Sequence, residues 1–264
     1  MDTVTDTDTS PSFDFDNARA AWLALPMAVT ATALAKLLVV PDMLLWYFCA
    51  IPTHEMGHAL AGWLSGRLVI PVGAFIPMAG MTFYFSFERL LPVYVVLLAG
   101  FVGLFVLGRR RQSPILSGLA LVLIVLQFKM TWLDSPAQAK MLFTLGGLNG
   151  EYLLSTGLIL AHFHRLPIPR WDFFRYLALG AGTYVLGSAW WLWHRIAAGR
   201  ADLPLGSFLN GQGDSGGDLN QLMEVHGWSA PGLVAHFNHL GTLCLGLVLA
   251  DYLWTGWRAL QARP

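Results

Sequence analysis

The densest polar cluster of the chain lies inside one of its most apolar stretches. Residues 49–63 read CAIPTHEMGHALAGW, which places His54, Glu55 and His58 within one short segment. On a helix, side chains at positions i and i+4 share one face, so the two imidazoles can bind one metal ion. The glutamate beside the first histidine can reach water on that metal and act as a general base. The HExxH spacing therefore predicts a metal site with hydrolytic chemistry.

The donor set of this cluster favours zinc. Zn²⁺ is commonly bound by histidine and carboxylate ligands, and it lowers the pKa of a bound water towards 7. Polar side chains that join helices within a bilayer are the other interpretation of such a cluster. Ionisable side chains at that depth are costly, however, and their presence at metal spacing favours a functional site. We therefore expect Zn²⁺ as the cofactor, with His54 and His58 as ligands and Glu55 as the catalytic base.

The composition of the whole chain indicates a membrane protein. Of its 264 residues, 55% are hydrophobic and only 12% are charged, about half the charged share of a soluble domain. The 16 basic and 16 acidic side chains cancel, so no net charge favours nucleic acid as a partner. A soluble protein of this length would need more polar surface, and we expect a lipid bilayer around the chain.

The apolar segments predict an all-α polytopic membrane protein. A spanning helix needs about twenty largely apolar residues, and about seven segments meet that requirement. A short strand or re-entrant segment is expected after the HExxH helix, at 67–89, because prolines and glycines interrupt an aromatic and β-branched sequence there. The expected spans are 19–40, 43–66, 90–108, 114–133, 141–163, 173–197 and 230–257.

The segments outside these helices are short or polar. Residues 1–18 are acidic and polar, and we expect a disordered tail there, with a second tail at 259–264. Between the tails, 19–258 is expected to form a single transmembrane domain. The polar stretch at 199–229 is rich in glycine and acidic residues, but its spacing does not match a calcium-binding EF-hand loop. We interpret this stretch as a solvated loop or a lid.

The sequence HEMGHALAGWLSGR, with HExGH inside an expected transmembrane helix, resembles the site-2 protease family of intramembrane zinc metalloproteases. The sequence that follows, LVIPVGAFIPMAGMTFYF, is similar to the Gly- and Pro-rich strand segment after that helix in the family. The resemblance covers about residues 50–85. It implies zinc bound by His54 and His58, Glu55 as the catalytic base, and hydrolysis of a peptide bond in or near the membrane. We accordingly expect an integral, multi-pass protein of a bacterial cytoplasmic membrane.

The third zinc ligand of that family is an aspartate in an Asp-Gly motif on a later transmembrane segment, and this sequence contains no Asp-Gly dipeptide. The nearest feature is the Leu-Asn-Gly at 148–150, which has Asn149 in the place of the aspartate and is followed by Glu151. We expect Glu151 as the third ligand, although a carboxylate here could instead pair with a basic residue. Asn149 is expected to stabilise an oxyanion, as amides do in hydrolases. The alternative ligands are His236, His239 and Asp172.

These features favour a zinc metalloendopeptidase of the site-2 protease type that hydrolyses a membrane-tethered peptide through metal-activated water. The missing Asp-Gly supports an alternative: a non-catalytic scaffold, or a subunit of a larger membrane complex, that retains a structural metal site. A metal or proton transporter is a third class. An enzyme needs three protein ligands and an open position, whereas a structural site is closed by four. A transporter needs a wet path to both sides of the membrane.

Overall fold

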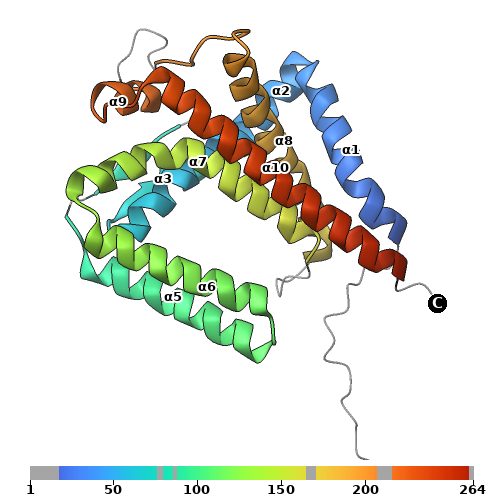
Figure 1. The fold of residues 1–264 in the computed structure, drawn as a ribbon, viewed down its shortest axis with the longest axis horizontal. Coiled ribbons are helices and arrows are strands. Elements are labelled where there is room, and N and C mark those ends of the chain that lie inside the picture. The colour runs from blue at the N-terminus through green and yellow to red at the C-terminus, as the bar shows by residue number, and fades with distance from the viewer. Residues whose placement is uncertain (1–17, 76–79, 86–87, 165–170, 207–215, 262–264) are drawn as a thin grey trace, which may run out of the picture.

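The computed structural model describes residues 18–75, 80–85, 88–164, 171–206 and 216–261, which form a helical assembly with one small two-stranded sheet (Figure 1). Almost all of the predicted N-terminal tail, and the end of the C-terminal tail, lie outside these residues. The elements in chain order are α1 (Ala18–Lys36), α2 (Val39–Leu45), the π-helical turn η1 (Trp46–Ala50), α3 (Ile51–Leu64), β1 (Val69–Pro71), α4 (Val72–Phe75), β2 (Thr82–Tyr84), α5 (Leu91–Arg110), α6 (Pro114–Phe128), the π-helical turn η2 (Lys129–Leu133), α7 (Pro136–His162), α8 (Trp171–Ala197), α9 (Asp218–Glu224) and α10 (Ala230–Gln261).

The helices confirm the prediction of an all-α membrane protein. Three of them are long and apolar enough to span a bilayer, namely α5, α6 together with η2, and α10. A fourth candidate is the pair formed by α1 and the segment Val39–Leu64, which is bent by 118° and is either a broken span or a re-entrant loop. Helices α7 and α8 each have 27 residues, or about 40 Å at the helical rise, but both carry many glycine and polar residues. The expected number of seven spans is therefore not confirmed.

The strand segment predicted after the HExxH helix is confirmed. Strands β1 and β2 pair in antiparallel fashion, with Val69 opposite Tyr84 and Pro71 opposite Thr82. Beyond the strands, the backbone N–H of Gly73 donates to the carbonyl of Met81 at 2.9 Å. The hairpin lies against α3, because the Thr82 hydroxyl donates a hydrogen bond to the carbonyl oxygen of Glu55 on that helix at 3.1 Å.

Helix α7 is the central element of the fold, with α3 packed on it and with α8 and α10 also against it (Figure 1). It starts at a complete capping box, in which the Ser135 hydroxyl accepts from the Gln138 N–H and the Gln138 side chain accepts from the Ser135 N–H. On its side facing α8 and α10, fully buried residues such as Tyr152 and Ile159 join Phe237 in the hydrophobic core. This packing holds α7 in place for its contact with α3.

The contact between α3 and α7 is made by glycines. A Cβ atom on Gly57 of α3 would lie 2.2 Å from the carbonyl oxygen of Gly146 and 2.7 Å from the Cα of Gly150, both on α7. A Cβ on Gly146 would in turn lie 2.8 Å from the Gly57 carbonyl oxygen and 2.9 Å from the Cβ of Ala61. Small residues allow such close backbone approach between membrane helices. The two helices are therefore packed backbone to backbone at the level of the HExxH motif.

We predict that Gly146→Ala destabilises the protein, because the added methyl group would force α3 and α7 apart. Overpacking of this kind costs about 1–3 kcal/mol. The measurement is the thermal unfolding midpoint in detergent. The matched control is Gly157→Ala on the same helix, where a Cβ would meet no atom within 4 Å. Equal midpoints for the two variants would contradict the close contact.

Candidate metal centre

The HExxH residues lie on α3 directly after an irregular turn. The π-helical turn Trp46–Ala50 precedes α3, and Pro52 stands in the first turn of that helix without an N–H to donate. The Thr53 hydroxyl donates to the carbonyl of Cys49 at 2.6 Å, which satisfies one of the backbone acceptors in this turn. Single π-helical turns occur often at functional sites. The helix that follows places His54 and His58 one turn apart on one face.

The two histidines meet a carboxylate from a distant part of the chain. The Nε2 atoms of His54 and His58 are 3.1 Å apart, and Oδ2 of Asp218 lies 2.9 Å from the first and 3.1 Å from the second. Ligand atoms at zinc–nitrogen and zinc–oxygen distances in a tetrahedral site are about 3.3 Å apart. Within the described part of the chain, these three residues form a cluster that could hold a metal ion. The triangle of ligand atoms has the size that a zinc ion requires.

A glycine on α7 leaves space beside this triangle. A Cβ atom on Gly147 would lie 2.4 Å from Nε2 of His54 and 2.5 Å from Nε2 of His58. Any side chain at this position would enter the space next to both ligand atoms. Two imidazoles and one carboxylate also form a donor set that zinc commonly takes. The residues present therefore fit a zinc ion, both in their chemistry and in the space between them.

Asp218 is the first residue of α9, at the end of the polar segment that follows α8. The Asn220 side chain accepts a hydrogen bond from the Gly206 N–H at 2.8 Å, and a Cβ on Gly217 would lie 2.1 Å from the carbonyl oxygen of Gly206. These contacts join the two ends of the segment 206–217 and fix the start of α9. Burial opposes ionisation of Asp218, but His58 and His54 outweigh it and hold the pKa of this carboxyl well below its usual range. Asp218 is therefore the anionic member of the triangle.

Glu151, the residue expected as third ligand, lies on the other side of the His54 ring. Its Oε1 atom accepts a hydrogen bond from Nδ1 of His54 at 2.8 Å, while Nε2 of the same ring faces Asp218. The Nδ1 atom of His58 donates in a similar way to the carbonyl oxygen of Phe143 at 2.7 Å. The structure thus brings Glu151 to the site but places it outside the triangle of Nε2 and carboxylate atoms.

The other expected residues lie away from the triangle. Asn149 is two positions after Gly147 on α7, about 200° around the helix, and its Oδ1 accepts from Nε2 of His236 on α10 at 3.0 Å. The position of Asn149 argues against its expected oxyanion role. The same hydrogen bond holds His236 against α7, outside the triangle. His239 is exposed and belongs to no metal-ligand cluster among the described residues. The side chain of Asp172 lies outside the described part.

Glu55 faces the β1–β2 hairpin. Its side chain is 5% exposed, and its Oε2 atom accepts a hydrogen bond from the Thr82 hydroxyl. A Cβ on Gly73 would lie 2.6 Å from Cγ of Glu55, so the hairpin backbone packs directly on this side chain. The carboxylate next to the first histidine is therefore held by the strand segment rather than by α7.

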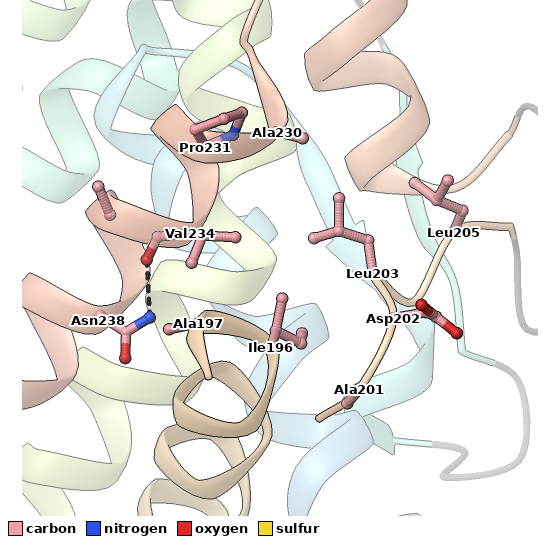
Figure 2. Close-up of a pocket in the computed structure, with 11 residues that line it drawn as sticks. Ile196, Ala197, Ala201, Asp202, Leu203, Leu205, Ala230, Pro231, Val234 and Asn238 are labelled. Atoms are coloured by element: carbon pink, nitrogen blue, oxygen red, sulfur yellow. Dashed lines mark hydrogen bonds between the residues drawn. The ribbon is translucent and has the colours of Figure 1, made fainter. Parts of the chain in front are cut away.

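A separate cleft of about 660 Å³ lies between the end of α8, the segment 201–205 and the start of α10 (Figure 2). Its lining is mostly aliphatic, including Ile196, Leu203 and Val234, and the Asn238 amide at its edge donates to the Val234 carbonyl at 2.9 Å. Among its lining residues, Asp202 is the one with an ionisable side chain. One carboxylate forms no cluster of metal ligands, so the candidate metal site among the described residues is the α3–α7–α9 cluster and not this cleft.

The comparison with known families agrees with this site. The family model described as Peptidase M50B-like matches residues 27–198, which is more than half of the chain. The chain belongs to the Peptidase M50B-like family. This membership confirms the resemblance to site-2 proteases that the HEMGH sequence indicated. No curated protein and no solved structure gives a significant match. The M50B-like region contains His54, Glu55, His58 and Glu151 but ends before Asp218.

Sequence reasoning missed Asp218 as a partner of the histidines. Its acidic side chain lies in a glycine-rich polar segment with no zinc-ligand spacing, and such segments are typically solvated loops. The only signal in the sequence was a carboxylate shortly before the last apolar segment. Sequence spacing does not show that this segment folds back onto α3.

We predict that Gly147→Ala lowers zinc binding, because the new methyl group would occupy the space beside both Nε2 atoms. The expected result is a loss of most of the bound zinc, measured by elemental analysis of purified protein. Gly157→Ala, on the same helix and facing open space, is expected to keep the wild-type zinc content. Normal zinc content in Gly147→Ala would show that the metal does not sit between these two rings.

Proposed function

We propose that this chain is an intramembrane zinc metallopeptidase that hydrolyses membrane-tethered peptides. The observation that carries the proposal is the triangle of His54, His58 and Asp218 ligand atoms, next to the glutamate of an HExxH motif. Membership of the Peptidase M50B-like family supports the same reaction class. The bacterial cytoplasmic membrane remains the expected location.

The number of ligands favours an enzyme over a structural metal site. The cluster among the described residues contains three ligand residues, the number that catalytic zinc sites use, whereas structural sites use four. The side chains of His54 and Asp218 are 23% and 25% exposed, so the rest of the protein does not fully enclose them. A zinc ion held by these three residues would keep a position open for water or substrate.

In this proposal, a bound zinc ion supplies Lewis acidity and lowers the pKa of the attacking water. Asp218 and the two imidazoles hold the ion, and Asp218 also brings a negative charge to the site. Glu55 takes the proton from the attacking water and returns it to the leaving amine. The Thr82 hydroxyl donates a hydrogen bond to Oε2 of Glu55 and so holds this carboxylate in place. No covalent link between enzyme and substrate is needed.

The hairpin and the membrane helices support a peptide in the bilayer as the substrate. Membrane-buried α-helical peptides keep their backbone hydrogen bonds, so a scissile bond must be unwound before water can attack it. The β1–β2 segment lies directly against Glu55, so the proposed base is adjacent to backbone that is already extended. We therefore propose a locally extended segment of a membrane-tethered protein as the substrate class.

We predict that Glu55→Gln abolishes hydrolysis but retains zinc. General-base catalysis contributes about 10²- to 10⁴-fold, and we expect a loss of that size. The assay compares cleavage of a panel of single-span peptides in proteoliposomes, with zinc content measured on the same samples. Zinc-loaded wild-type protein that cuts none of these peptides would favour the scaffold alternative.

We predict that Asp218→Ala removes most of the bound zinc, because it deletes one of three ligands. The measurement is the zinc content of purified protein after dialysis against a weak chelator. Glu224→Ala is the matched control, since this exposed carboxylate lies on the same short helix but outside the cluster. Equal zinc content in the two variants would rule out Asp218 as a ligand.

A further inference from the structure

Helix α7 contacts the Nδ1 atom of each histidine in the HExxH motif. The side chain of Glu151 accepts from Nδ1 of His54 at 2.8 Å, and the backbone carbonyl of Phe143 accepts from Nδ1 of His58 at 2.7 Å. A neutral imidazole carries its proton on one nitrogen and a free lone pair on the other. An acceptor at Nδ1 therefore leaves Nε2 of each ring free to bind a metal, and both Nε2 atoms face Asp218.

We propose that Glu151 is a positioning residue that holds His54 with its proton on Nδ1 and with Nε2 directed at the metal. The inference rests on the proposed zinc site and assigns Glu151 a role other than ligand. Carboxylates that accept from the outer nitrogen of a metal-bound histidine fix its tautomer and orientation and increase its basicity. The carboxylate of Glu151 occupies that place on His54.

The close packing of α7 on α3 keeps Glu151 at this distance. A Cβ on Gly150, the residue before Glu151, would lie 2.5 Å from the Cα of Gly57 and 3.2 Å from the carbonyl oxygen of Thr53. The turn of α7 that carries Glu151 is therefore in backbone contact with the turn of α3 that carries His54. This contact fixes the backbone at Glu151 relative to the backbone at His54.

The two histidines differ in what holds them. The partner of His58 is a main-chain carbonyl, whereas the partner of His54 is an ionisable side chain that is 21% exposed. A partly buried carboxylate is costly unless a charge-assisted hydrogen bond stabilises it. A point substitution can therefore remove the Nδ1 partner of His54 but not the main-chain partner of His58.

The test compares zinc affinity in full-length protein in detergent, by competition with a coloured chelator, for wild type, Glu151→Ala and Glu151→Gln. Loss of a positioning partner typically weakens metal binding about 10- to 100-fold, and we expect that loss for Glu151→Ala. Glu151→Gln should recover most of the affinity, because the amide oxygen still accepts from Nδ1–H. In both variants the zinc stoichiometry at saturation should equal that of wild type.

The matched control is Asp251→Ala, which removes a carboxylate from another imidazole, since Oδ1 of Asp251 lies 3.3 Å from Nε2 of His164. This variant should bind zinc as wild type does. Cobalt substitution adds a second measurement: Glu151→Ala should keep the intense absorption of a four-coordinate site, with shifted band positions. A variant that lost a ligand would bind cobalt weakly or not at all.

Two results would overturn the positioning role. If Glu151→Gln loses zinc as completely as Asp218→Ala, Glu151 is a ligand and the role proposed here is wrong, while the zinc site stands. If Glu151→Ala binds zinc with wild-type affinity, the hydrogen bond does not position His54. If the proposed zinc site itself is wrong, a different result is expected. In that case His54→Ala and Asp218→Ala would also leave zinc binding unchanged.

Discussion

The metal centre depends on the backbone contact between α3 and α7. Gly57 on one helix and Gly146 and Gly150 on the other leave no room for a Cβ atom between them. Helices in a bilayer gain little from the hydrophobic effect when they associate, so close van der Waals packing has to hold them together. Helix α7 supplies the acceptors for both imidazoles. A wider separation of α3 and α7 would therefore break both hydrogen bonds, and the two rings would no longer be held in one orientation.

The functional groups of α3 are divided between two neighbours. The imidazoles of His54 and His58 face α7 and Asp218, whereas the carboxylate of Glu55 faces the β1–β2 hairpin. The candidate metal ligands and the proposed base are thus supported by different elements.

The carboxylate that meets the two histidines comes from outside the long helices. Asp218 starts a short helix in the polar segment between α8 and α10, beyond the region matched by the family model. Burial disfavours the charged form of Asp218, and the neighbouring imidazoles of His58 and His54 offset that cost. Glu151, which does lie on a long helix, is paired with His54 instead.

The sequence by itself determined the membrane class, the helical segments, the strand pair after the motif and the His54–Glu55–His58 cluster, because all of these follow from local composition and local spacing. It also indicated that Glu151 belongs near the cluster. Only the tertiary structure decided which nitrogen Glu151 contacts, that Asn149 turns towards His236, and that Asp218 closes the triangle. These three outcomes depend on the rotation of α7 about its axis and on the return of a polar segment to α3. Both are set by packing between residues far apart in the chain, and sequence periodicity does not report that packing.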